Sequence, residues 1–192
     1  MTVLCNLLQR LTQAEEEALR AYGADSTFHH ATVQGWREQI NRQPGFEEYY
    51  RNAGKHTRAL DAAIAKSELI SDAVVYSAHA RGFSVRGAMI GKAEKFCGLQ
   101  YSYPGFISTS DSLEWAKSFL STRQHEESRP TLLEFRLPSG FKALDVRVVN
   151  QIGESEYLLG RKLIFNIVGG REEEVNGVAD AVLYLELEPI RS

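Results

Sequence analysis

The spacing of apolar residues changes near residue 70, and this change limits the folds open to the chain. Before that point apolar residues recur every three or four positions, the period of an amphipathic helix. After it they alternate or form short continuous runs, as strands do. At 192 residues the chain is long enough for one domain with a core. We therefore expect an α+β fold in a single domain over residues 1–192, with a helical lobe at about 1–70 and a β core at about 71–192.

The first helix has the clearest end signals. Thr12 and Glu15 have the spacing of a capping box, and Gly23 is expected to stop the helix. By the same periodicity, the predicted helices cover residues 12–22, 31–42, 56–67 and 112–121.

The second part of the chain is predicted to form a mostly antiparallel sheet. Residues 169–177 contain the pair Gly169-Gly170 and are expected to form a polar, hairpin-like connection. The predicted strands cover residues 73–76, 106–108, 131–137, 162–168 and 181–187.

Composition excludes several classes of function. With 22 Lys and Arg against 25 Asp and Glu, the net charge of −3 gives no general attraction to nucleic acid or anionic membranes. No apolar run approaches the roughly 20 residues of a membrane span, and the N-terminus lacks the basic region of a secretory signal peptide. Cys5 and Cys97 have no metal-ligand spacing, so we expect two free thiols, no metal site and a reducing compartment.

Two short motifs carry possible chemistry. In the first, a predicted strand ends in the hydroxyl side chains of Ser108, Thr109 and Ser110. Alone, this motif fits Thr109 as an ordinary strand residue and Ser110 or Asp111 as a helix cap. In the second, Glu154 and Glu156 lie two positions apart, on the same side of an extended backbone. Like charges so close raise one another's pKa, although a solvated loop with two acids is the simpler explanation of that motif alone.

Taken together and in order, these motifs resemble a known enzyme family. An arginine at the end of a strand, then Ser108-Thr-Ser110, then Glu154-x-Glu156 before an apolar strand, is similar to the arginine-specific mono-ADP-ribosyltransferases of clostridial binary toxins and bacterial effectors. Residues 12–22, 60–66 and 138–140 resemble further parts of this family. The resemblance implies the ADP-ribosyltransferase fold, with an NAD cleft between two antiparallel sheets.

The resemblance also assigns roles to the motif residues. Members of the family split the bond between nicotinamide and ribose in NAD and pass ADP-ribose to a nucleophile. Glu156 matches the catalytic glutamate, which holds the ribose and stabilises positive charge in the transition state. Glu154 matches the residue that prepares an arginine acceptor. Ser108 matches the serine that positions Glu156, with Thr109 and Ser110 bracing it.

The family's phosphate-binding arginine has three possible positions. Ser77 follows the first core strand where relatives carry arginine. Arg81, followed by Gly82, keeps the arginine–glycine order and is the preferred position for binding NAD phosphate as a fixed fork. Arg86 is the third possibility.

Phe119 falls where toxin relatives place an aromatic residue against the nicotinamide ring. A place on the core face of its helix fits the sequence equally well.

The function implied by the resemblance is transfer of ADP-ribose from NAD to an exposed arginine of a target protein. Such an enzyme would act in the cytoplasm of a target or host cell as an effector, toxin or phage enzyme, secreted without a signal peptide, and would need no metal. Two alternatives stay open. One is an NAD glycohydrolase or a transferase to a non-protein acceptor, and the other is a non-catalytic binding module on the same fold.

Overall fold

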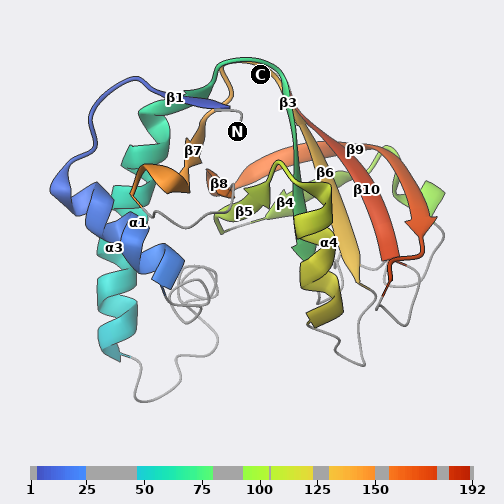
Figure 1. Ribbon diagram of the computed structural model, residues 1–192, viewed down its shortest axis with the longest axis horizontal. Helices are drawn as coiled ribbons and strands as arrows, with labels where there is room; N and C mark the ends of the chain where they lie inside the picture. Colours follow the sequence, from blue (N-terminus) through green and yellow to red (C-terminus); the bar gives the residue numbers. More distant parts are fainter. Residues whose placement is uncertain are drawn as a thin grey trace. The chain divides into compact units, whose positions relative to one another are not determined.

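The computed structural model describes residues 4–24, 47–79, 93–103, 105–122, 130–149, 156–176 and 182–190 (Figure 1). The chain forms two compact units. The helical unit comprises Met1–Ser71, Tyr103–Ser108 and Ser139–Lys162, and the sheet unit comprises Asp72–Ser102, Thr109–Pro138 and Leu163–Ser192. The helical unit therefore takes two later segments besides the predicted lobe at about 1–70. That all 192 residues act as one catalytic domain stays a prediction.

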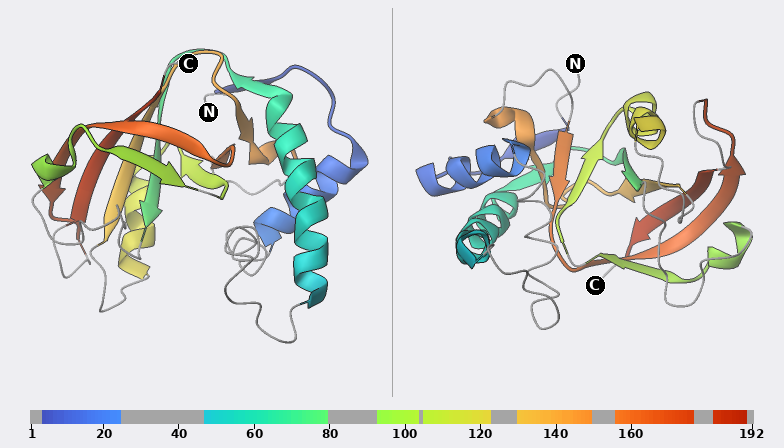
Figure 2. Two further views of the ribbon diagram at one scale, coloured as in Figure 1. Left: turned by 180° about the vertical axis from the view of Figure 1, so that it is seen from behind. Right: turned by 90° about the horizontal axis from the view of Figure 1, so that it is seen from below.

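Two helices form the framework of the helical unit, α1 (Gln13–Ala24) and α3 (Glu47–Ala65), which lie side by side (Figure 2). The predicted capping box is confirmed, because the Thr12 N–H donates to Glu15 Oε2 at 2.7 Å and the Glu15 N–H donates to Thr12 Oγ1 at 3.4 Å. The core of this unit combines both helices with later strands and contains Leu11, Ala18, Leu19, Tyr22, Leu60, Ala63, Ile64, Phe106, Leu144, Val146 and Leu158.

The helix ends differ from the predictions at two points. Gly23 lies inside α1, which continues to Ala24, so glycine does not stop this helix. The helix α3 begins at Glu47, nine positions before the predicted start at 56, and ends at Ala65. The predicted helix over 31–42 lies outside the described residues.

Short strands complete the helical unit. The strands β1 (Cys5–Leu7) and β2 (Ser67–Leu69) pair antiparallel, as do β7 (Ala143–Asp145) and β8 (Glu156–Leu159). The strand β8 lies between β7 and β5 (Ile107–Ser110). The strand β5 spans the boundary of the two units, since Ser108 belongs to the helical unit and Thr109 to the sheet unit.

The sheet unit carries the long strands in the order β4-β9-β10-β6-β3, followed by the end of β5. The strands β10 and β6 are parallel, whereas β9–β10, β3–β6 and β3–β5 are antiparallel, so the prediction of a mostly antiparallel sheet agrees with these pairings. Their bounds are β3 Ala73–His79, β4 Gln100–Tyr103, β6 Thr131–Leu137, β9 Leu163–Glu173 and β10 Val182–Pro189.

One helix, α4 (Leu113–Thr122), covers part of one face of this sheet (Figure 2). Its Ala116 and Leu120 pack against Leu132 of β6 and against Val182 and Tyr184 of β10. The predicted helix over 112–121 is therefore confirmed to within one residue at each end.

The predicted connection over 169–177 is wrong at its start, because Gly169 and Gly170 lie inside β9. A side chain at Gly170 would crowd the backbone of a neighbouring segment, whereas one at Gly169 would meet only the movable end of the Glu186 side chain. A Cβ atom at Gly169 would lie 2.8 Å from Glu186 Oε2, and one at Gly170 would lie 3.0 Å from the carbonyl oxygen of Ala93. Gly170 therefore admits a close neighbour to the strand, and the glycine pair does not turn the chain.

Both cysteines are free thiols, as expected, with Cys5 buried and Cys97 exposed. Among the described helices, none combines the length and the apolar character needed to cross a membrane.

Candidate active site

The structure joins the two sequence motifs through one hydrogen bond. Ser108 Oγ donates to Glu156 Oε1, although the two residues lie 48 positions apart in the sequence. Ser108 is carried by β5, and Glu156 is the first residue of the neighbouring strand β8. Both side chains are half-buried. The serine therefore holds the carboxylate at a defined place without removing it from solvent.

A third residue, Tyr22 of α1, joins this pair, and motif reasoning did not assign it to the site. Its hydroxyl oxygen lies 3.5 Å from Ser108 Oγ, at the outer limit of a hydrogen bond. The Tyr22 side chain is buried, and this burial raises its pKa well above the ordinary value of a phenol; the Glu156 carboxylate acts in the same direction. Tyr22 therefore stays neutral, and its hydroxyl can donate a hydrogen bond to Ser108 Oγ. Two sequence signals pointed to Tyr22, namely its place on the apolar face of the first helix and the resemblance of residues 12–22 to the family, but neither placed it beside Ser108.

Aromatic and charged contacts hold the strand beneath Ser108. The Phe106 ring meets the Tyr22 ring edge-on, with centroids 6.1 Å apart. Arg161, just after β8, lies over the Phe106 ring, with its Cζ 5.5 Å from the ring centroid. The Arg161 Nε also donates to Asp61 Oδ1 of α3 at 3.1 Å. The two strands that carry Ser108 and Glu156 are thus both tied to helices of the same unit.

Thr109 and Ser110 belong to the sheet unit and are both buried. Ser110 pairs with Tyr76 across β5 and β3, and its Oγ accepts the Ser112 N–H at 3.1 Å. Ser112 in turn caps α4, because its Oγ accepts the Trp115 N–H at 3.2 Å. The helix cap is therefore Ser112, and the predicted caps Ser110 and Asp111 are wrong. Ser110 fixes the turn between the strand and the helix.

Phe119 does not lie on the core face of its helix. Ala116 and Leu120 occupy that face, whereas the Phe119 side chain is 39% exposed. Its ring meets Trp115 edge-on, with centroids 5.1 Å apart. The core alternative for Phe119 is wrong, and the contact with nicotinamide stays a prediction.

Several predicted site residues lie outside the described residues, namely Arg81, Gly82, Arg86 and Glu154. Ser77 is described: it is buried within β3 and pairs with Leu133 of β6. The strand β3 continues to His79, so its predicted end at residue 76 is wrong. Within the described residues, no group of three or more His, Cys, Asp or Glu side chains could hold a metal ion.

Solved structures with the same fold are bacterial ADP-ribosyltransferases. The toxin Plx2a from Paenibacillus larvae is 19% identical and matches 94% of this chain and 88% of its own with a TM-score of 0.69. The toxin BECa of C. perfringens, solved with NADH, is 16% identical and matches 96% of this chain but only 45% of its own, with a TM-score of 0.70. Vis, from Vibrio splendidus, was solved with agmatine; it is 17% identical and matches 97% of this chain and 79% of its own, with a TM-score of 0.69.

These similarities identify the ADP-ribosyltransferase fold, and the predicted α+β class is confirmed. The sheets differ from the expected two antiparallel ones, because the described strands β3 to β10 share one mixed sheet, and β1 and β2 form a separate pair. A family model described as ADP-ribosyltransferase exoenzyme matches residues 4–187. The chain therefore belongs to the ADP-ribosyltransferase exoenzyme family and is a mono-ADP-ribosyltransferase that uses NAD as its co-substrate. A comparison with curated proteins found no significant match.

Proposed function

We propose that this enzyme transfers ADP-ribose from NAD to an arginine side chain of a target protein, with Glu156 as its catalytic carboxylate. The observation that carries the proposal is the hydrogen bond from Ser108 Oγ to Glu156 Oε1. This bond joins the serine motif to the second glutamate of the Glu-x-Glu motif. The family resemblance assigns Ser108 the role of positioning Glu156, the catalytic glutamate.

The chemistry requires negative charge at the reacting sugar. When the bond between nicotinamide and ribose breaks, the electron pair leaves with nicotinamide and positive charge develops on the ribose. Glu156 stabilises this charge and accepts a hydrogen bond from the ribose 2′-hydroxyl. Ser108 fixes one carboxylate oxygen of Glu156, and Tyr22 donates toward Ser108. A carboxylate held in place needs less rearrangement during the reaction.

The arginine acceptor requires a second carboxylate. A guanidinium group stays protonated in water and is a poor nucleophile. As its nitrogen forms the new bond to ribose, the acceptor must lose a proton. Glu154 lies two positions before Glu156 and is proposed to accept that proton. Vis, which shares the fold, was solved with agmatine, a small molecule that carries a guanidinium group.

The remaining part of NAD is assigned to three further elements. Arg81, with Gly82, is proposed to bind the diphosphate; β3 extends to His79, two positions before this arginine. Phe119 is proposed to contact nicotinamide, in agreement with its exposure on α4. Thr109 and Ser110 are proposed to brace Ser108. The enzyme is proposed to modify its target protein in the cytoplasm of a host cell.

The test uses NAD with agmatine as a small guanidinium acceptor. We expect nicotinamide release and ADP-ribosylated agmatine in equal amounts from the wild type. Glu156→Gln should abolish both products, whereas Glu154→Gln should abolish transfer and retain slow release of nicotinamide. Release without transfer by the wild type would instead identify an NAD glycohydrolase. A wild-type level of both products in Glu156→Gln would overturn the assignment of the catalytic residue.

Mass spectrometry of a host-cell lysate treated with the enzyme then identifies the modified residue. Modification at arginine supports the proposal, and modification only at other residues contradicts it. The Glu156→Gln variant in the same lysate controls for modification by host enzymes.

A further inference from the structure

The antiparallel strands β7 and β8 carry a buried group of three polar residues on the side away from Glu156. Asp145 ends β7, Arg147 lies in the short helix η3 (Val146–Val148), and Tyr157 is the second residue of β8. Asp145 and Tyr157 are register partners across the two strands. Because side chains alternate along a strand, Tyr157 and its neighbour Glu156 point to opposite faces. A contact at Tyr157 can therefore fix Glu156 without touching the reactants.

Arg147 holds Asp145 through a forked contact. Oδ1 of Asp145 accepts the Arg147 backbone N–H at 3.0 Å and Nε at 2.8 Å, while Oδ2 accepts Nη2 at 2.5 Å. Both side chains are largely buried, with 9% of Asp145 and 15% of Arg147 exposed. These hydrogen bonds give both oxygens of a carboxylate that is shielded from water a partner.

The same guanidinium also reaches the next strand. Arg147 Nη2 donates to the Tyr157 hydroxyl at 2.9 Å, and Tyr157 is fully buried. Arg147 therefore ties the end of β7 to the start of β8, at the residue next to Glu156. A lysine could keep a charge beside Asp145, but its ammonium lacks the planar fork that serves two acceptors at once.

We propose that Arg147 is a positioning residue for the transferase reaction, which sets the place of Glu156 by holding Tyr157 against Asp145. The inference rests on the proposed role of Glu156. A reacting group must be held to within about 0.5 Å of its productive place, so a loosened start of β8 lowers the rate of the chemical step. NAD affinity is expected to change little, because Tyr157 points to the opposite face of β8 from Glu156, and Arg147 contacts Tyr157 at its hydroxyl.

The test compares Tyr157→Phe and Arg147→Lys with the wild type in nicotinamide release. Tyr157→Phe removes only the hydroxyl and keeps the ion pair of Asp145 and Arg147. We expect it to lower kcat about fivefold, with the KM for NAD within about twofold of wild type. Arg147→Lys is expected to lower kcat about tenfold or more at a similar KM. Urea denaturation establishes that each variant is folded under the assay conditions.

The matched control is Tyr184→Phe, which removes a buried tyrosine hydroxyl in the sheet unit and is expected to keep the wild-type kcat. Wild-type kcat values in both folded test variants would overturn the inference, as would a kcat loss that Tyr184→Phe shares. If Arg147→Lys does not fold, Tyr157→Phe alone decides. Glu156→Gln separates the two proposals. Full activity of this variant refutes the proposed function, whereas its inactivity beside wild-type kcat in every folded test variant refutes only the role of Arg147.

Discussion

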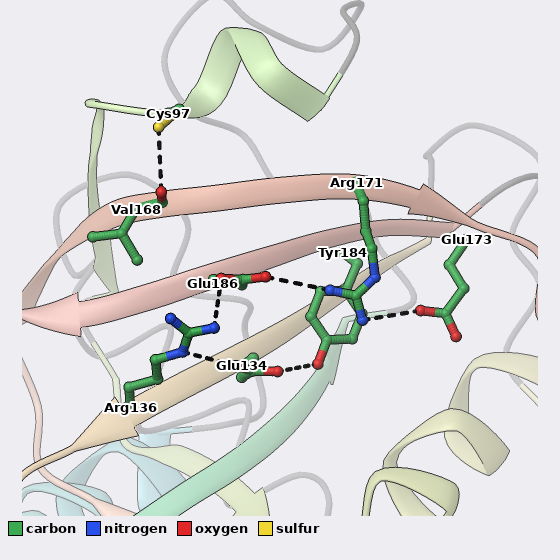
Figure 3. Close-up of polar contacts among 8 residues, drawn as sticks. All are labelled: Cys97, Glu134, Arg136, Val168, Arg171, Glu173, Tyr184 and Glu186. Carbon is green, nitrogen blue, oxygen red and sulfur yellow. Dashed lines mark hydrogen bonds and ion pairs between the residues drawn. The ribbon is translucent and has the colours of Figure 1, made fainter.

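Each unit of the molecule contains a glutamate that accepts a hydrogen bond from a hydroxyl group, but the surroundings of the two glutamates differ. In the helical unit Ser108 donates to Glu156, and the Tyr22 hydroxyl lies close behind the serine. In the sheet unit Tyr184 donates to Glu134, whose other oxygen accepts Arg136 Nε at 3.0 Å (Figure 3). A contact between a hydroxyl and a carboxylate therefore does not by itself define a catalytic site.

The surroundings of Glu134 are a series of ion pairs across the sheet. Arg136 contacts Glu186 at 2.6 Å, and Arg171 contacts both Glu186 and Glu173 at 3.3 Å (Figure 3). Lys117 of α4 extends the series to Glu173 at 2.5 Å. The Arg171 Cζ also lies 3.5 Å from the centre of the Tyr184 ring. With Glu134, the series balances three positive and three negative side chains, which suits a structural role on a sheet surface.

The largest expected effect separates the two glutamates directly. Glu156→Gln keeps the shape of the side chain but removes the charge that stabilises the transition state, so we expect nicotinamide release to fall at least about 100-fold. Glu134→Gln makes the same chemical change within the ion-pair series and should keep wild-type release. The measurement is the initial rate of nicotinamide release at saturating NAD. Equal losses in both variants would refute the distinction between the units.

The next comparison concerns the stability contributed by ion pairs in each unit. Asp145→Asn leaves the largely buried Arg147 without its counter-charge, and we expect a loss of about 3 kcal/mol in the free energy of unfolding. Arg136→Met removes a cation whose side chain is 45% exposed, and the expected loss is below about 1 kcal/mol. Urea denaturation at pH 7 measures both. A cost for Arg136→Met as large as that for Asp145→Asn would contradict the difference in burial.

The sequence predicted the elements whose pattern is local and missed those that depend on partners. The strand β6 has the predicted bounds, because its apolar run is continuous, and the Thr12–Glu15 cap is visible in four residues. The strands β1, β2 and β7 have three residues each, too few for an alternation of apolar and polar residues to be recognised. They are defined by their pairing with other strands.

In the candidate site too, the residues in local motifs were predicted, and those that depend on packing between distant segments were missed. Ser108 and Glu156 came from a resemblance between ordered motifs, and the structure brings these two together. Tyr22 could not be assigned to them, since its place beside Ser108 follows from the packing of α1 against Phe106, 84 positions along the chain. The roles of Asp145 and Arg147 likewise depend on the β7–β8 register.

A smaller effect compares two carboxylates that each contact a lysine. Burial raises the pKa of Glu15, but hydrogen bonds from Lys66 and Thr12 outweigh burial and leave it lowered. The Lys117 hydrogen bond is the main cause that lowers the pKa of Glu173. Because each folded pKa lies below the unfolded one, both pairs stabilise the protein above about pH 4.3 and lose this contribution as the pH falls through the folded pKa.

We therefore expect Glu15→Gln to cost about 1–2 kcal/mol at pH 7 and Glu173→Gln less than about 1 kcal/mol, since Glu15 is 6% exposed and Glu173 is 25% exposed. Glutamine retains an oxygen for the capping box, so the charge is the main change. Thermal unfolding at pH 7 and in acid measures the difference from wild type. A cost that persists unchanged in acid would show that the charge is not its cause.

The smallest expected effect concerns the hydroxyl groups around Glu156. Tyr22→Phe keeps the edge-on packing against Phe106 and removes only an oxygen 3.5 Å from Ser108, so we expect kcat to fall about threefold at an unchanged KM for NAD. Because burial raises the Tyr22 pKa, the ratio of wild-type to variant kcat should stay constant from about pH 6 to pH 9. A ratio of one would show that the Tyr22 hydroxyl does not contribute to the orientation of Glu156 by Ser108.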